Sequence, residues 1–385
     1  MPRSRTAAKS TTTRSRQPKA ANVVAGWSDR AELVGLTLLL TCEEETLLYA
    51  QYTIGLHAWL LGQIQKTHPA LSRRLHDNAN EKAFAISSLD GAFVQTGQQL
   101  TLRAGQVYRW QVTALSNSVV KWLSRWLPRR PEAIDLRGAP LQIKSIKLGL
   151  PPTDYKTLVA LPVPAKPKVT LSFLSPTSFR RKGNHFPLPL PVNLYHSYLR
   201  RWQSFAKTAP DQIDFLDWID AHTVVLRHHI QSKKVAAGKR GSVTGFVGAV
   251  ELGLDAAAYE DPAFVDWFYR LAQFAPYCGT GHKTTFGLGQ TQLGWQLPEA
   301  YPMVDIAAED ALGERIAELT TLFTLQRKRV GGSRAHDIAE TWATILARRE
   351  QGESLIIIAE ELDMNYETVK TYSKLARRAL RDDEA

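Results

Sequence analysis

The chain has 385 residues, 44% of them hydrophobic, and a formal net charge of +11. Its length predicts two or three domains with a sizeable core, and its apolar runs are far shorter than the roughly 18–20 residues of a membrane-spanning helix. The two cysteines, Cys42 and Cys278, offer no disulfide framework. We therefore expect a protein of the reducing cytoplasm that contacts no membrane.

The positive charge is concentrated in three segments. Residues 1–22 contain six Lys or Arg and no acid, and their composition predicts a basic disordered tail. Residues 166–207 contain eight Lys or Arg and residues 221–250 contain five, again without Asp or Glu, which predicts a surface that binds a polyanion. Aromatic residues in the first of these two blocks either stack on bases of single-stranded nucleic acid or fill a core: Phe179, Phe186, Tyr195, Tyr198 and Trp202.

Hydrophobic patterning in the first half of the chain alternates between strands and helices. We predict strands over 33–41, 83–89, 107–115 and 141–148, and helices over 46–66 and 117–127. This βαββαβ order is typical of a ferredoxin-like fold. The proline-rich residues 151–167 then predict a linker or an irregular connection.

A second, looser ferredoxin-like unit follows, with strands over 168–174, 243–252 and 291–297 and helices over 192–206 and 262–274. An aspartate at every third residue from Asp211 to Asp220 predicts the solvated face of another helix, with Ile213, Phe215, Leu216 and Ile219 inward. Beyond residue 302 the composition changes to helix formers. We therefore predict an α+β protein with tandem ferredoxin-like domains at 23–165 and 166–302 and an all-α unit at 303–385.

Residues 279–290 form a glycine-rich segment with four glycines and one lysine. Glycine lets a backbone approach a ligand closely, and adjacent N–H groups can hold phosphate oxygens. The segment lacks the GxxxxGK[ST] pattern, and its glycines precede a predicted strand rather than open a helix, which argues against a mononucleotide site. It predicts either contact with a polynucleotide backbone or a plain glycine-rich hairpin.

Two further stretches, together with the glycine-rich segment, carry a resemblance to a known family. The first runs Leu174-Ser175-Pro176-Thr177-Ser178-Phe179-Arg180 and continues to Pro187, Pro189 and Arg200-Arg201-Trp202. The second runs Pro69-Ala70-Leu71-Ser72-Arg73-Arg74-Leu75-His76 and continues to Lys82-Ala83-Phe84-Ala85-Ile86-Ser87. In these features, over residues 30–297, the chain resembles the CRISPR-associated endoribonucleases of the RAMP superfamily, tandem ferredoxin-like proteins that cut precursor CRISPR RNA within its repeats.

The resemblance implies metal-independent RNA cleavage that leaves 2′,3′-cyclic phosphate and 5′-hydroxyl ends. His76 matches the catalytic histidine of some members, and Lys82, six residues later, matches a lysine suited to stabilise the developing negative charge. The tyrosine that such members carry on the preceding helix is replaced by Leu61. His57 lies one helical turn earlier on the same face and Tyr52 lies further back. Either is a candidate for the third catalytic group, with His57 the one we favour, unless that role is dispensable.

We expect repeat RNA, single-stranded or hairpin, to contact basic and glycine-rich positions of the second domain: Arg180, Arg181, Lys182, Arg200, Arg201, Lys239, Arg240, Gly281, His282, Lys283, Thr284, Gly287 and Gly289. No cofactor is predicted. No metal site is predicted either, because His228 and His229 are adjacent and are not accompanied by a Cys, Asp or Glu cluster.

Residues 352–370 resemble the helix-turn-helix of sigma-factor region four, with Ala359 at the helix crossing, Leu362, Met364 and Val369 in the core, and Asp363 at the turn. Residues 368–381 contain five Lys or Arg and no acid, yet residues 334–385 contain eight basic and eleven acidic residues. Since DNA-binding domains are usually more basic, we expect this unit to contact either nucleic acid or protein.

Three functions fit these features. The first is a metal-independent endoribonuclease that processes CRISPR repeats in a prokaryotic cytoplasm. The second is a non-catalytic RNA-binding subunit that joins CRISPR effector proteins; Leu61 favours it and the intact His76–Lys82 pair counts against it. The third is a DNA-binding transcriptional regulator, which only the C-terminal unit supports.

Overall fold

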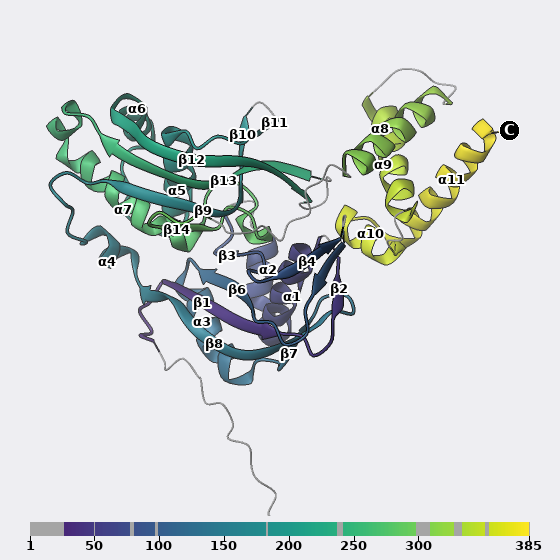
Figure 1. The fold of residues 1–385 in the computed structure, drawn as a ribbon, viewed down its shortest axis with the longest axis horizontal. Coiled ribbons are helices and arrows are strands. Elements are labelled where there is room, and N and C mark those ends of the chain that lie inside the picture. The colour runs from purple at the N-terminus through teal and green to yellow at the C-terminus, as the bar shows by residue number, and fades with distance from the viewer. Residues whose placement is uncertain are drawn as a thin grey trace, which may run out of the picture.

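The computed structural model describes residues 27–49, 51–77, 81–96, 99–181, 184–236, 242–297, 309–326, 333–350 and 354–384. These residues form two α+β domains and a helical C-terminal unit (Figure 1). The predicted basic tail at 1–22 lies outside them. Within the described part of the chain, no helix is both long and apolar enough to cross a bilayer.

The N-terminal domain is built on a five-stranded antiparallel sheet with the order β3-β6-β1-β8-β7. In chain order its elements are β1 (Leu33–Thr41), β2 (Thr46–Leu48), α1 (Tyr52–Thr67), α2 (Pro69–Asp77), β3 (Phe84–Ile86), β4 (Phe93–Thr96), β5 (Gln99–Leu102), β6 (Tyr108–Ala114), α3 (Asn117–Trp126), β7 (Ala133–Asp135) and β8 (Pro140–Thr153). The order β8-β1-β6-β3 is that of a ferredoxin-like sheet, and α1 and α3 pack on it in one hydrophobic core.

Two details of this domain differ from the sequence prediction. The predicted helix 46–66 begins only at Tyr52, because Thr46–Leu48 forms strand β2 and pairs with β5. The predicted linker is partly ordered: β8 extends to Thr153, and α4 (Tyr155–Val159) follows it. The carboxylate of Asp154 starts α4 by accepting a hydrogen bond of 2.6 Å from the backbone N–H of Thr157.

The C-terminal ferredoxin-like domain has the sheet order β12-β13-β9-β14. Its elements are β9 (Val169–Thr177), β10 (Phe179–Arg181), β11 (Asn184–Phe186), α5 (Pro191–Phe205), α6 (Gln212–His222), β12 (Thr223–Ala236), β13 (Ser242–Leu254), α7 (Pro262–Cys278) and β14 (Thr291–Leu293). Equating β9, β12, β13 and β14 with strands one to four gives the same strand order as in the N-terminal domain. The tandem ferredoxin-like fold is thereby confirmed.

Packing in this domain decides between the two interpretations of its aromatic residues. Tyr195, Tyr198 and Trp202 on α5 are fully buried and belong to the core, so they cannot stack on nucleic-acid bases. Helix α6 buries Phe215 and Ile219 as predicted. The prediction that Ile213 points inward is wrong: its side chain is 70% exposed in the first turn of the helix.

The C-terminal unit is all-α, as predicted, and consists of α8 (Glu309–Leu325), α9 (Ser333–Glu350), α10 (Leu355–Leu362) and α11 (Tyr366–Glu384). Asp363 ends α10 in the left-handed conformation, with φ 55° and ψ 43°. Ala359 and Val369 are buried together between α10 and α11. That this helix pair works like sigma-factor region four stays a prediction.

An ion-pair network, Arg137–Glu361–Arg348, attaches this unit to the N-terminal domain. Glu361 on α10 is 7% exposed and contacts Arg348 of α9. Its other oxygen lies 3.0 Å from the guanidinium of Arg137, which follows β7. The same guanidinium lies 4.3 Å above the centre of the Tyr49 ring.

We predict that Glu361→Ala loosens the C-terminal unit, because it removes the carboxylate that the buried Arg348 contacts. Breaking a buried ion pair from one side costs about 3 kcal/mol or more. Hydrogen exchange should accelerate in α9 and α10 but not in the two ferredoxin-like domains. Glu360→Ala is the matched control, because Glu360 is the exposed neighbour on the same helix; equal acceleration in both variants would contradict the prediction.

Candidate active site

The glycine-rich segment, residues 279–290, leaves the end of α7 in a conformation that only glycine adopts readily. Gly279, Gly281, Gly287 and Gly289 all have φ between 68° and 81°. A Cβ atom at Gly289 would lie 1.9 Å from the carbonyl oxygen of Thr280, and one at Gly281 would lie 2.3 Å from that of Ser178. Glycine is therefore required here by close backbone approach within the protein.

Backbone N–H groups along the segment donate to acceptors inside the protein, among them those of Gly279, Phe286 and Gln290. Thr280 donates to the Gly289 carbonyl at 2.8 Å, and Gly289 donates to that of Pro176 at 3.1 Å. His282 donates to the Ser178 carbonyl at 3.0 Å, and Gly281 donates to the Ser197 hydroxyl at 2.8 Å. These bonds contradict the prediction that these amides hold phosphate oxygens. Gly287, Gly289 and Thr284 are also buried, so the prediction that they contact RNA directly is not supported.

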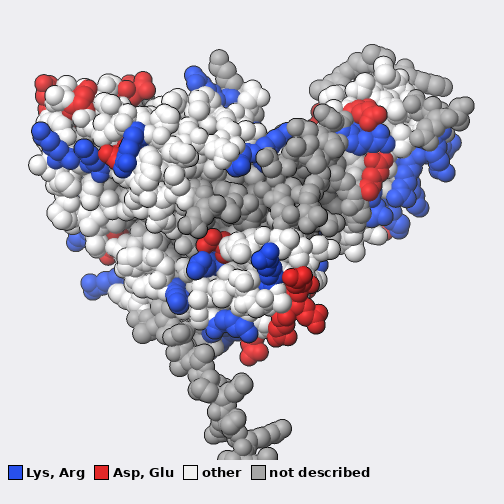
Figure 2. Space-filling model, in the orientation of Figure 1, with Lys and Arg blue, Asp and Glu red and all other residues white. Residues whose placement is uncertain are grey.

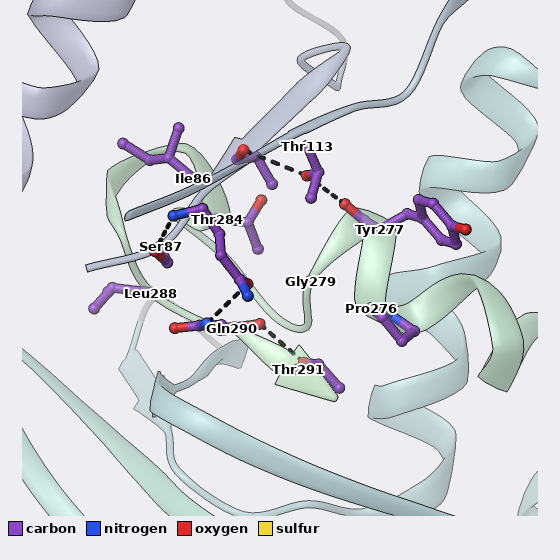
Figure 3. A pocket seen from close by; sticks show the side chains of 13 residues that line it. Ile86, Ser87, Thr113, Pro276, Tyr277, Gly279, Thr284, Leu288, Gln290 and Thr291 are labelled. Atoms are coloured by element: carbon purple, nitrogen blue, oxygen red, sulfur yellow. Dashed lines mark hydrogen bonds between the residues drawn. The ribbon is translucent and has the colours of Figure 1, made fainter. Parts of the chain in front are cut away.

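The segment joins the two ferredoxin-like domains (Figure 3). The hydroxyl of Thr113 on β6 donates to the Tyr277 carbonyl at 2.6 Å, and the Gln290 amide donates to the Gln111 side chain at 2.9 Å. The cavity between these groups measures about 20 Å³, which is room for one water molecule. The cavity at this contact between the domains is thus too small to admit a nucleotide.

Among the predicted catalytic residues, His57 has a side chain that contacts the glycine-rich segment. It lies on α1, is half-buried, and its Nδ1 is 2.8 Å from the Thr285 carbonyl oxygen. Its ring stacks on Phe286 of the 3₁₀ turn η4 (Thr284–Phe286), with centroids 4.1 Å apart. Because a carbonyl can only accept, Nδ1 carries a proton, and Nε2 is the basic nitrogen of the neutral ring.

Lys82 folds back onto the end of α2. Its Nζ donates to the carbonyl oxygen of Leu75, the residue before His76. His76 lies in α2, and its side chain is outside the described part of the structure. Phe84, two residues after Lys82, has its ring centroid 5.8 Å from that of His57. Lys82 thus contacts the residue next to His76, and Phe84 contacts His57, so the three predicted catalytic residues lie on neighbouring segments of the chain.

Glu81 was not among the predicted site residues. It forms ion pairs with two residues that were predicted to bind RNA, Arg200 and Arg201. Arg200 lies 2.6 Å from the Glu81 carboxylate and stays 51% exposed, whereas Arg201 lies 3.2 Å from it and is 3% exposed. Arg201 also donates to the carbonyls of Ser197 and Gly281. The prediction that Arg201 contacts RNA is therefore wrong, because its guanidinium holds the glycine-rich segment from within.

His282 is partly buried and stacks on His185, with ring centroids 5.3 Å apart. Its Nδ1 lies 2.8 Å from the Ser178 carbonyl oxygen. Burial lowers the pKa of His282 to about 4, and the neighbouring His185, Lys283 and Arg180 act in the same direction. The imidazole is thus neutral near pH 7 and poorly suited to exchange a proton there.

The remaining predicted RNA contacts divide into two groups. Arg180 and Arg181 on β10 are exposed, and Lys283 is partly exposed in a left-handed conformation with φ 58°. The others lie outside the described residues: Lys182, Lys239 and Arg240. Among the described residues, no three of His, Cys, Asp or Glu gather in a group that could hold a metal ion.

Two family models match the chain in order. The model described as CRISPR Cas6 N-terminal domain matches residues 35–155, and the model described as CRISPR-associated endoribonuclease Cas6 matches residues 171–291. Together they cover more than half of the chain, and they contain His57, His76, Lys82 and the glycine-rich segment. None of the curated protein sequences compared with the chain matches it.

Solved structures agree with the family models. A Cas6 product complex is 26% identical with a TM-score of 0.53, over 68% of this chain and 99% of that one. A Cas6 substrate mimic complex is 25% identical with a TM-score of 0.51, over 68% and 99%. A Thermus thermophilus Cas6 is 20% identical with a TM-score of 0.52, over 70% and 100%, and supports the fold alone.

We predict that Gly289→Ala destabilises the protein by about 3 kcal/mol or more, because the new Cβ would clash with a backbone carbonyl. Gly105→Ala is the matched control: its φ of 72° is close to the 69° of Gly289, but no atom lies within 4 Å of its Cβ position. The Gly105→Ala variant should lose only roughly 1–2 kcal/mol of stability, because an alanine is strained at a positive φ. Urea denaturation measures both, and equal losses would contradict the close approach.

We also predict that His282 makes stability fall in mild acid. Its folded pKa of about 4 is below the unfolded value of about 6.5, so the unfolded chain binds the proton first. The contribution of His282 to the free energy of unfolding is present above about pH 6.5 and is lost as the pH falls toward 4. Between pH 7 and 4.5 the wild type should lose about 2 kcal/mol more unfolding free energy than His282→Asn, which keeps a donor for Ser178. Parallel pH profiles would contradict this.

Proposed function

Because the chain belongs to the Cas6 family of CRISPR-associated endoribonucleases, we propose that it is a metal-independent endoribonuclease that cuts precursor CRISPR RNA at a defined position within each repeat. The products carry a 2′,3′-cyclic phosphate and a 5′-hydroxyl. The family supports RNA cleavage itself; the mechanism, the products and the residue roles below are our proposal.

The chemistry needs three groups. A base removes the proton from the ribose 2′-hydroxyl, whose oxygen attacks the adjacent phosphorus, and the bond from phosphorus to the 5′ oxygen breaks. An acid protonates that leaving oxygen, and a cation stabilises the charge on the phosphorane. His76 takes one of the two proton-transfer roles, Lys82 is the cation, and His57 is the candidate for the remaining proton transfer.

The position of Lys82 is the observation that carries this assignment. Its bond to the Leu75 carbonyl holds a positive charge at the end of α2, where His76 is the next residue. Lysine is a compact donor that suits a developing oxyanion. The segment lies inside the stretch matched by the Cas6 N-terminal model.

The RNA-binding surface is proposed on the second domain outside the glycine-rich segment. Arg180 and Arg181 project from the β10–β11 hairpin, where the Arg181 guanidinium lies 5.4 Å from the centre of the Phe186 ring. The acid-free block 166–207 supplies the surrounding positive charge. Repeat RNA would lie across these exposed residues toward α2, with Lys283 at the edge of the segment as a further phosphate contact.

We predict that wild type cuts labelled repeat RNA at one site in EDTA, and that His76→Ala slows single-turnover cleavage about 10²–10⁴-fold, the usual contribution of general acid–base catalysis. Lys82→Ala should also slow the reaction. His336→Ala, which removes an exposed histidine of α9, is the control and should cleave normally.

The other outcomes identify the alternatives. Cleavage that persists in His76→Ala and stops in His57→Ala would transfer the main proton-transfer role to His57. Tight repeat binding without cleavage, in EDTA or in magnesium, would favour a non-catalytic RNA-binding subunit. Cleavage that requires magnesium would contradict the metal-independent mechanism.

A further inference from the structure

Helix α11 carries a row of five basic residues along one side. Lys370, Lys374, Arg377, Arg378 and Arg381 follow one another at spacings of four, three, one and three residues, so at 100° per residue they lie within an arc of about 100°. From Lys370 to Arg381 the row spans about 17 Å of the helix. We call these five residues the basic stripe.

The basic stripe faces solvent because the opposite side of α11 is buried. Val369, Ser373 and Ala376 pack against α9 and α10 and are at most 3% exposed. Lys374, Arg377 and Arg381 are exposed. Figure 2 shows blue side chains gathered over α11.

The overall acidity of the C-terminal unit does not cancel this local charge. Glu361 is buried in the Arg137–Glu361–Arg348 network, and Glu350 contacts Arg315 at 3.1 Å on the other helices of the unit. Residues 368–381 contain no acid; Glu367, just before them, pairs with Lys370 at 3.2 Å, and three acids follow Arg381 at the end of the helix. The net charge of the C-terminal unit therefore hides a local basic surface formed by the exposed Lys374, Arg377 and Arg381.

The network also determines where the basic stripe is held. Arg137 belongs to the N-terminal domain, where it lies over the Tyr49 ring, and its ion pair with Glu361 links α10 to that domain. Helix α11 packs on α10 and α9. The basic stripe is thus attached to the body that carries His57 and Lys82.

We propose that the basic stripe of α11 binds the phosphate backbone of the RNA strand that extends from the repeat into its flanking sequence. The proposal rests on the proposed function, because a repeat bound at the active site brings its covalently linked flank to this surface at high effective concentration. Exposed Lys and Arg suit phosphate oxygens and carry no sequence preference. That fits a flank whose sequence differs from one repeat unit to the next.

The test compares two RNAs on the full-length protein, a repeat alone and the same repeat with flanking nucleotides on both sides. Both carry 2′-deoxyribose at the scissile position, so binding is measured without cleavage. The variant is Lys374→Ala/Arg377→Ala/Arg381→Ala, which keeps a good helix former at each position. The control Lys121→Ala/Arg125→Ala/Arg129→Ala removes the same charge from exposed residues at α3 and the turn after it.

We expect the wild type to bind the flanked RNA more tightly than the repeat. The α11 variant should lose about tenfold in affinity for the flanked RNA and nothing for the repeat, and its salt dependence, d log K/d log[salt], should weaken by about 2, as three lost contacts to a single strand imply. The α3 control should keep the preference.

Three results would overturn the proposal. The first is an α11 variant that binds the flanked RNA as tightly as the wild type does. The second is an α3 control that loses as much affinity for the flanked RNA as the α11 variant. The third is binding of duplex DNA that depends on α11 and is tighter than binding of the flanked RNA. A wild type that binds the repeat but ignores the flank would overturn the proposal and leave the proposed function intact. A wild type that binds neither RNA would instead contradict the proposed function itself.

Discussion

Backbone passes so close to backbone at Gly289 and Gly281 that there is no room for a Cβ atom, and these approaches, to Thr280 and Ser178 within the C-terminal domain, shape the glycine-rich segment that contacts the N-terminal domain. The glycine-rich segment belongs to the C-terminal domain by sequence, yet its Gln290 bonds to Gln111 of β6. Arg201 stabilises it from the interior, with its charge balanced by Glu81 of the N-terminal domain. The glycine-rich segment therefore serves as a structural connection between the two ferredoxin-like domains.

The same connection reaches the candidate catalytic groups. Thr285 and Phe286 come from the glycine-rich segment, and they determine which nitrogen of His57 is protonated and how its ring lies. Glu81, which balances Arg201, directly precedes Lys82. A change in the contact between the domains would thus be transmitted to both sides of the candidate site. Under the proposed function, the glycine-rich segment would thereby influence RNA cleavage without holding RNA through its buried amides.

Much of the fold could be predicted from the sequence, because strand and helix periodicity in both domains is strong. The strand Leu33–Thr41 was predicted with its observed bounds. Strand β12 was missed, since it lies at the edge of its sheet and exposes Val224, Val225 and Leu226 together, so it lacks the usual alternation. The left-handed turn at Asp363 could be predicted because the resemblance placed it between two helices.

The site was less predictable, because local sequence does not show which partner a group finds. Arg201 was predicted to contact RNA, but it pairs with Glu81, which lies 120 positions earlier in the chain. The amides of the glycine-rich segment looked available for phosphate because their acceptors at Pro176 and Ser178 are about a hundred residues away. The role of Glu361 depends in the same way on Arg137, which no local pattern connects to it.

We propose that RNA is cut beside α2 while the glycine-rich segment keeps its internal bonds. The most direct test is a structure of the protein with repeat RNA that carries 2′-deoxyribose at the scissile position. We expect the scissile phosphate to lie beside His76 and Lys82, with the amides of Thr280, Gly281 and Gly289 still bonded to protein. A scissile phosphate bound by those amides, or one remote from Lys82, would contradict it.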